Sequence, residues 1–258
     1  MKTQSLFTRR KQARVHDLGK MTLRELTPAY FSYPAIQVYV TLAVACTAGA
    51  VWFGALTIPL RTALAALSAV IMYPVIWYAL HRWILHSRFL YRFPQTARLW
   101  KRIHFDHHQD PNRLDVLFGS LTNTLPTLLV ATLPVGYWIS GDVSGALSAL
   151  SAGLVTTCVY EFCHCIQHLN FQPRSAWLVR IKKLHMAHHF HNETGNFGII
   201  SFWVDGLFGT AYAEMTDKPR SPTVYNLGYD DKEAERYPWV AALSQDSRRR
   251  RAARAAAE

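Results

Sequence analysis

The stretch AIQVYVTLAVACTAGAVWFGALTIPL, residues 35–60, contains no charged side chain over 26 positions. A second uncharged run follows at once, over the 19 residues from 62 to 80. A helix rises about 1.5 Å per residue, so either run can cross a hydrocarbon core of about 30 Å. The two runs therefore predict a pair of membrane-spanning helices joined by the short connection IPLR, residues 58–61.

Two more apolar runs lie further along the chain. Residues 117–140 carry no charge, and a membrane helix tolerates their prolines, Pro126 and Pro134, better than a water-exposed helix does. Residues 143–160 form the fourth run and continue without a turn signal into EFCHCIQH. Because ISGDVSG, residues 139–145, connects these two runs, the sequence predicts a second hairpin and four spans in all.

The basic residues are distributed unevenly around these spans. The sequence holds 28 lysines and arginines and has a formal net charge of +11. Seven of them precede the first span, seven lie between the second and third, thirteen follow the fourth, and only Arg61 lies in a connection on the other side. The positive-inside rule therefore places both termini in the cytoplasm. Because the charges lie beside spans, they do not favour a nucleic-acid partner.

The terminal segments give expectations about targeting. The first 20 residues lack a short apolar region with a cleavage site, so we expect no cleavable signal peptide. The segment SRRRRAAR, residues 247–254, is expected either to lie against anionic headgroups or to be a solvated, disordered tail. No retention signal ends the sequence, which favours a bacterial inner membrane over the endoplasmic reticulum. Four cysteines in or near the spans indicate reduced thiols.

Eleven of the twelve histidines fall in the two pieces outside the spans, residues 81–116 and 161–258. The twelfth, His16, stands alone and is expected to be an ordinary surface residue. The others form four groups at or just beyond the ends of the second and fourth spans. These groups are HRWILH with His81 and His86, HFDHH with His104, His107 and His108, HCIQH with His164 and His168, and HMAHHFH with His185, His188, His189 and His191.

Helical spacing predicts which imidazoles lie together. Residues three and four apart share a helix face, so we expect the three histidines of HFDHH to project together, and likewise those of HMAHH and of HCIQH. His81 and His86 diverge by about 140° on an ideal helix, so they must serve different ions or straddle a helix end. Ten clustered imidazoles are too many for one ion, and two ions with about five each account for them.

Imidazole ligands suit zinc, copper, iron and nickel. The groups lie at the cytoplasmic edge of the spans, where an acyl chain could enter from the bilayer, and this location predicts a lipid-modifying oxidase. Breaking an unactivated C–H bond needs a redox-active metal, so we expect two iron ions, with zinc as a replacement acquired during expression or purification. A metal-binding or transport protein is the distant alternative, because transport sites lie near the bilayer midplane.

The succession HRWILH, HFDHH, HCIQH and HMAHH resembles the histidine signature of the integral-membrane fatty acid hydroxylase and sterol desaturase superfamily. The segment NETGNFGIISFWVDGLFGT, residues 192–210, is similar to the segment after the last histidine box of that family. The resemblance covers residues 74–210. It is closest to fatty acid 2-hydroxylases, because the first box reads H-x4-H and the third reads H-x3-H.

The resemblance implies O2-dependent hydroxylation of a lipid C–H bond, on a fatty acyl chain that is free or part of a sphingolipid. A sterol or carotenoid hydroxylase or desaturase of the same superfamily is the alternative. Because the sequence contains no H-P-G-G motif of a fused cytochrome b5 domain, we expect a separate electron donor of the cytochrome b5 or ferredoxin type, with its reductase. The metal ligands that the resemblance implies are His81, His86, His104, His107, His108, His164, His168, His185, His188 and His189.

Two further residues are candidates to support these ligands. Glu161 lies three residues before His164 and seven before His168, shares their helical face, and could accept a hydrogen bond from a ligand. His191 lies beyond the final pair of ligands and is expected to support them or to gate the substrate. The aromatic residues near the end of the second span are expected to form the interfacial belt, with an acyl tunnel as the alternative. They are Tyr73, Trp77, Tyr78 and Trp83.

The sequence thus predicts an all-α integral membrane protein with four transmembrane helices in two hairpins. A helical cytoplasmic cap is expected to hold a histidine-rich dimetal site. We divide the chain into a cytoplasmic N-terminal segment, residues 1–34, a membrane domain with the histidine boxes, residues 35–210, and a partly disordered cytoplasmic tail, residues 211–258.

Overall fold

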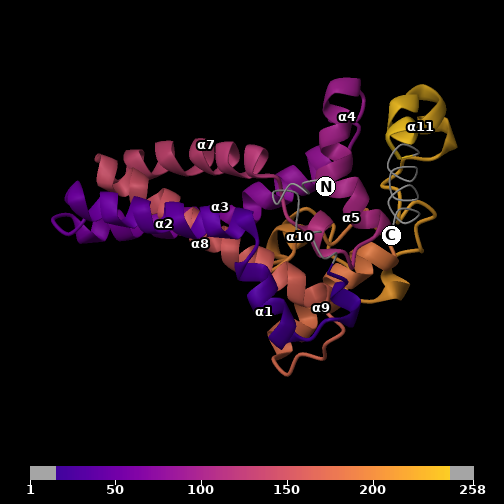
Figure 1. The fold of residues 1–258 in the computed structure, drawn as a ribbon, viewed down its shortest axis with the longest axis horizontal. Coiled ribbons are helices and arrows are strands. Elements are labelled where there is room, and N and C mark those ends of the chain that lie inside the picture. The colour runs from indigo at the N-terminus through magenta and orange to yellow at the C-terminus, as the bar shows by residue number, and fades with distance from the viewer. Residues whose placement is uncertain (1–15, 245–258) are drawn as a thin grey trace, which may run out of the picture.

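Four long helices form an elongated bundle, and shorter helices gather into a cap at one end of it (Figure 1). The structure is a computed structural model and describes residues 16–244. Within this range the chain is helical apart from loops and one isolated bridge between Asp17 and Arg113. The basic segment 247–254 lies outside the described residues, and so do residues 1–15.

The long helices are apolar and long enough to cross a membrane, which confirms the prediction of four such helices in two hairpins. Pro34 and Pro59 begin the first two, where proline's fixed φ suits a helix and its missing N–H costs no bond. The carboxylate of Asp142 caps the fourth by accepting from the N–H of Ser144 at 2.7 Å. The helices are α2 (Pro34–Trp52), α3 (Pro59–Leu80), α7 (Leu121–Ser140) and α8 (Val143–His168).

The first connection differs from the expected one at residues 58–61. Helix α2 ends at Trp52, and residues 53–58 turn the chain back before Pro59 begins α3. Gly54, with φ of 97°, adopts a left-handed conformation that favours glycine over other residues. The turn therefore lies within the uncharged run of residues 35–60, and the composition of that run does not indicate where the turn is.

Helix α8 is the centre of the bundle, because α2, α3 and α7 all pack against it. A side chain at Gly136 of α7 would meet the Cβ of Ala149 at 2.6 Å, so glycine permits the close approach of α7 and α8. On the outside of the bundle many apolar side chains are exposed, among them Val44, Leu64 and Val130. An exposed apolar surface of this kind suits contact with lipid.

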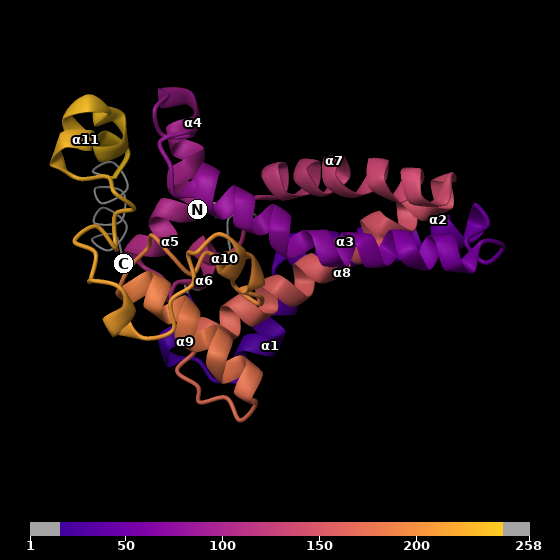
Figure 2. The same cartoon turned by 180° about the vertical axis from the view of Figure 1, so that it is seen from behind.

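The cap is built from short helices before, between and after the hairpins (Figure 2). Two segments of it, His81–Leu85 and Lys101–Phe105, are π-helices. The cap helices are η1 (Leu18–Lys20), α1 (Leu23–Phe31), η2 (His81–Leu85), α4 (Pro94–Trp100), η3 (Lys101–Phe105), α5 (Asp106–Gln109), α6 (Leu114–Leu117), α9 (Ala176–Phe190), α10 (Trp203–Leu207), η4 (Met215–Asp217) and α11 (Asp231–Arg236).

The described part of the expected tail packs onto the cap. Leu227 and Val240 belong to a buried cluster with Trp100 of α4. The carboxylate of Glu233 on α11 accepts hydrogen bonds from Arg88, at 2.9 and 2.6 Å, and from the Tyr91 hydroxyl at 2.8 Å. This part of the chain up to residue 244 is therefore folded against the loop between the hairpins.

Candidate metal centre

Ten histidines gather into two adjacent groups of five, which we call cluster A and cluster B. In each cluster one nitrogen of every imidazole lies within 4.8 Å of the corresponding nitrogens of the others. Nine of the ten residues are buried, and His86 is partly buried. Cluster A is His81, His86, His104, His108 and His188, and cluster B is His107, His164, His168, His185 and His189.

A π-helical turn brings His81 and His86 into the same cluster. The N–H of His86 donates to the carbonyl of His81 at 2.9 Å, which closes a turn of five residues in place of four. The wider turn directs both side chains to one side, with their Nε2 atoms 3.1 Å apart. Assigning this pair to different ions is therefore wrong, and His86, the C-cap residue of the π-helix, lies at a helix end as the other alternative required.

The two H-x-x-H-H boxes each contribute to both clusters, so the prediction that their three histidines project together is wrong. His104 and His108 belong to cluster A but His107 to cluster B, and on α9 His188 belongs to cluster A while its neighbour His189 belongs to cluster B. Successive helical residues point about 100° apart. A helix that passes between two sites can therefore present adjacent residues to each of them.

Backbone carbonyls orient three imidazoles of cluster A. The Nδ1–H groups of His81, His188 and His108 donate to the carbonyls of Phe197, Gly195 and Val224 at 2.5, 2.7 and 3.2 Å. With Nδ1 protonated, the Nε2 lone pair of each neutral ring faces the cluster.

The Nε2 atoms of all five imidazoles converge inside cluster A. The Nε2 atoms of His81, His86 and His104 lie 2.8 to 3.1 Å from one another. The buried Nε2 atoms of His108 and His188 have no hydrogen-bond partner. Lone pairs held this close repel one another unless a cation lies among them, so the residues fit a metal ion.

Cluster B has the same composition but fewer supporting contacts. The Nε2 atoms of His168 and His185 lie 3.1 Å apart, and both ring nitrogens of buried His107 are without a partner. The Glu161 carboxylate lies 4.0 Å from Nδ1 of His164 and accepts from the N–H of Gly119 at 3.4 Å. This cluster also fits a metal ion, and a supporting role for Glu161 stays a prediction.

Burial keeps the imidazoles of His104, His107, His188 and His189 uncharged. Removal from water lowers the pKa of His104, His107 and His189 well below the usual value, and neighbouring imidazoles lower it further. Burial likewise lowers the pKa of His188 to about 4. Neutral imidazole is the form that binds metal, so at neutral pH these side chains are ready to act as ligands.

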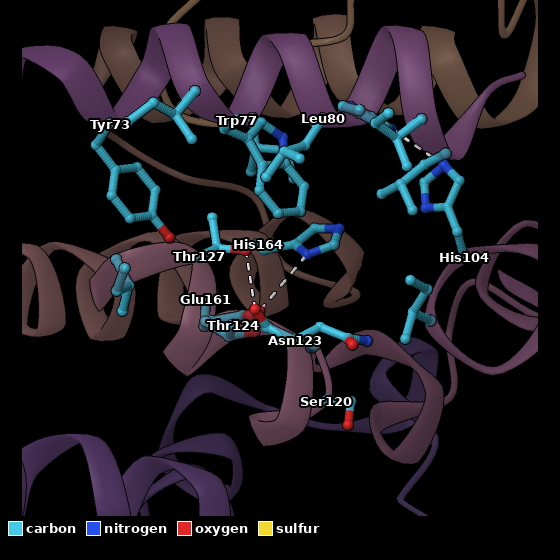
Figure 3. A pocket seen from close by; sticks show the side chains of 18 of the residues that line it. Tyr73, Trp77, Leu80, His104, Ser120, Asn123, Thr124, Thr127, Glu161 and His164 are labelled. Carbon is cyan, nitrogen blue, oxygen red and sulfur yellow. Dashed lines mark hydrogen bonds and ion pairs between the residues drawn. The ribbon is translucent and has the colours of Figure 1, made fainter. Parts of the chain in front are cut away.

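A largely apolar cavity of about 270 Å³ extends from the clusters into the bundle. Figure 3 shows Tyr73 and Trp77 of α3 facing Asn123 and Thr127 of α7 across it. Its lining includes histidines of both clusters, and it reaches Ala131 further along α7. The lining positions of Tyr73 and Trp77 favour the acyl-tunnel alternative for these two residues; Tyr78 is buried against Phe197 and Val204 instead, and Trp83 is exposed.

The remaining candidate residues lie apart from the clusters. Nε2 of His191 pairs with the carbonyl of Lys218 at 2.7 Å, and within residues 16–244 no hydrogen bond or ring contact joins His191 to a cluster histidine. Its expected role as a support or gate stays a prediction. The four cysteines are free thiols, in agreement with the sequence, and belong to neither cluster.

The structure thus combines four helices of membrane-spanning length with two buried histidine clusters, each able to hold a metal ion. The family model described as fatty acid hydroxylase matches residues 66–210, more than half of the chain. The chain belongs to the fatty acid hydroxylase family.

Known relatives agree with this assignment. A ceramide very long chain fatty acid hydroxylase of Saccharomyces cerevisiae is 30% identical over 150 residues, which cover 55% of this chain and 36% of the relative. A dihydroceramide fatty acyl 2-hydroxylase of Arabidopsis thaliana is 29% identical over 152 residues, 55% of this chain and 59% of the relative. The chain thus matches only about a third to three fifths of the length of these two relatives.

A solved structure shares the fold. It is described as full-length scs7p with only the hydroxylase domain visible, and it matches with a TM-score of 0.53 at 23% identity. The match covers 74% of this chain and 69% of the other.

Metal removal is expected to destabilise the protein. A metal ion that binds only the folded state stabilises that state by about 4.1 kcal/mol when its free concentration is 1,000 times its Kd. We expect about two metal ions per chain after purification, and a clear fall in the thermal midpoint after treatment with a chelator, reversed by adding metal back. Elemental analysis and thermal unfolding in detergent measure both quantities. An unchanged midpoint after complete metal removal would contradict this expectation.

Proposed function

We propose that this protein is a di-iron monooxygenase that hydroxylates a C–H bond of a fatty acyl chain, free or in a sphingolipid, using O2 and two electrons. The observation that carries the proposal is the apolar cavity that ends on histidines of both clusters. A cavity lined in this way accepts a hydrocarbon chain and presents it to a dimetal centre. The relatives named as a ceramide very long chain fatty acid hydroxylase and a dihydroceramide fatty acyl 2-hydroxylase support the same substrate class.

Iron is the metal we propose, because zinc has no redox change available and cannot reduce O2. Two bound iron ions would supply the activation of O2 and the oxidising power that side chains lack. Cluster A and cluster B would each hold one of them. Zinc found in a purified sample would be a replacement.

The residues of the chain hold and orient the substrate. Tyr73, Trp77 and Leu128 line the cavity with aromatic and aliphatic surface, which binds an acyl chain and excludes water. Because Ala131 lies eight positions after Asn123 on α7, the two are separated by about 12 Å along the helix axis. An acyl chain along this wall would have one end beside the clusters and the other inside the bundle.

Asn123 gives the cluster end of the cavity a polar group. Its Nδ2 atom is buried without a hydrogen-bond partner, and its side chain lines the cavity near Glu161 (Figure 3). We propose that this amide donates to the carbonyl oxygen of the acyl group. The carbons next to that carbonyl would then lie beside the clusters, as hydroxylation at the 2-position requires.

Replacing Asn123 with leucine, which has a similar size, is therefore expected to lower kcat/KM about 10-fold, the worth of one hydrogen bond to a buried group. Bound metal should not change. Assays with a defined acyl substrate measure the first quantity and elemental analysis the second. Thr122→Val changes an exposed neighbour that does not line the cavity and is the matched control. Equal kcat/KM for Asn123→Leu and the control would refute the role of Asn123.

We further propose that both termini lie on the cytoplasmic side, which the basic residues around the spans support. Electrons are proposed to come from a separate donor of the cytochrome b5 or ferredoxin type.

Lipid analysis tests the substrate class. The wild-type protein should be expressed in a host without hydroxylated acyl lipids, beside a variant with both His188 and His189 replaced by alanine. New hydroxy-acyl lipids in the wild-type strain alone would support the proposal. Altered sterols or carotenoids without hydroxy-acyl lipids would overturn the acyl substrate in favour of the sterol or carotenoid alternative. Metal uptake by proteoliposomes without any lipid product would indicate transport.

A further inference from the structure

Cluster A is supported by a loop that no histidine box includes. Two of its three carbonyl partners, Gly195 and Phe197, are separated by one residue in the segment after α9. Among the described residues, no backbone carbonyl accepts a hydrogen bond from an imidazole ring of cluster B. The two clusters have the same five-imidazole composition and differ in how their imidazoles are held.

Asp205 of α10 fixes the position of this loop. Its side chain accepts from the N–H groups of Phe197 and Gly198, each at 2.8 Å, and from the hydroxyl of Thr210 at 2.7 Å. Asp205 is completely buried, and no salt bridge to it is found within residues 16–244. A buried carboxylate is costly unless its oxygens are hydrogen-bonded, and here the three donors supply those bonds.

The loop is constrained at two further positions. A Cβ at Gly198 would lie 2.2 Å from the carbonyl oxygen of Ser201, so only glycine fits there. Asn196, which lies between Gly195 and Phe197, adopts a left-handed conformation with φ of 54°. Its side chain donates to the carbonyl of Tyr212 at 2.9 Å and accepts from the N–H of Tyr212 at 3.0 Å. The peptides on both sides of Asn196 are therefore held in one orientation.

We propose that Asp205 is a positioning residue for cluster A. By holding the N–H groups of Phe197 and Gly198, it fixes the loop whose carbonyls accept from His81 and His188, and so keeps the Nε2 atoms of these two imidazoles directed into cluster A. This inference rests on the proposed metal-binding function. Residues that orient metal ligands from outside typically change metal affinity by about 10- to 100-fold when replaced. Loss of the Asp205 carboxylate should therefore lower the metal affinity of cluster A and leave the metal affinity of cluster B unchanged.

The two sites can be separated by removing one ligand at a time. His168→Ala disables cluster B and leaves cluster A to be measured, and His108→Ala does the reverse. Asp205→Asn is then added to each variant, and the metal-free, detergent-solubilised proteins are titrated with Co2+, whose visible absorption reports its ligand geometry. We expect Asp205→Asn to weaken Co2+ binding about 10- to 100-fold in the His168→Ala protein and by less than about two-fold in the His108→Ala protein.

Asp217→Asn is the matched control. This exposed carboxylate also accepts backbone N–H groups, those of Ala213 and Glu214 at 3.1 and 2.9 Å, but within residues 16–244 it has no hydrogen bond to the loop that carries Gly195 and Phe197. Thr210→Val is a milder second variant. It removes one hydrogen-bond donor to Asp205 and leaves the two hydrogen bonds from the backbone N–H groups of the loop. This variant should weaken Co2+ binding only at cluster A, and by a smaller factor than Asp205→Asn does.

If Asp205→Asn weakens Co2+ binding by the same factor in the His168→Ala and His108→Ala proteins, Asp205 supports the fold in general. That result would overturn the proposal. Unchanged Co2+ binding in both backgrounds, for Asp205→Asn and Thr210→Val alike, would overturn it as well. If Asp205→Asn does not yield folded protein, the Thr210→Val titrations decide in the same way. Failure of the otherwise unaltered protein to bind metal would instead refute the proposed function.

Discussion

Replacing either His188 or His189 with alanine is expected to abolish product formation and to lower bound metal from about two ions per chain to about one. These neighbours on α9 belong to different clusters, so each replacement removes one ligand from one site. Replacing a residue that only orients a metal ligand already costs about 10- to 100-fold, so we expect the loss of a ligand to exceed 100-fold in rate. Product analysis and elemental analysis on the same samples measure both effects.

The control for these variants is His191→Ala. His191 lies two residues further along, outside both clusters, with its ring paired to the carbonyl of Lys218. This variant should retain two ions per chain. Full activity and metal content in His188→Ala or His189→Ala would refute the two-cluster assignment.

Filling the cavity is expected to produce the second-largest effect. Ala131 lines the cavity on α7, away from the clusters, and phenylalanine there would occupy space that a long acyl chain needs. Even one methylene can change discrimination by about 10-fold or more in a closely fitting apolar site. We therefore expect Ala131→Phe to lower hydroxylation of long chains by at least about 10-fold, with a smaller effect on short ones. Competition assays with acyl substrates of two lengths measure the ratio.

Val130→Phe is the matched control for this change. Val130 is the preceding residue of α7 and is 77% exposed on the outside of the bundle, so its replacement leaves the cavity intact. Both variants should retain bound metal. Equal losses for long and short chains in Ala131→Phe would contradict the assignment of the cavity to the acyl chain.

The spans and the histidine groups could be predicted because each depends on local sequence. An uncharged run of about 20 residues is enough to indicate a membrane helix. The number of clustered histidines likewise indicated two ions with about five imidazoles each, and the structure has two clusters of five. The division of the boxes between the clusters depends on where α9 and α5 pass between the two sites, which spacing within one helix does not contain.

Other features depend on the backbone and left no clear pattern in the sequence. The π turn at His81–Leu85 has no marker residue such as proline, so an ideal helix gave the wrong angle for His86. The carbonyls of Phe197 and Val224 orient imidazoles, and any residue type supplies a carbonyl. Asp205 lies in the segment SFWVDGLFG, residues 201–209, and only the fold brings its carboxylate to the N–H groups of residues 197 and 198.

The most direct test of the account uses isotope-labelled oxygen. Protein purified without oxygen and loaded with Fe2+ should be supplied with an acyl lipid, a reductant and O2 labelled with the heavy isotope, in unlabelled water. The account predicts a hydroxy-acyl product that carries one labelled oxygen atom, formed by the wild-type protein and absent with His188→Ala. A protein with both ions bound that forms no hydroxylated lipid, or a product whose hydroxyl oxygen comes from water, would contradict it.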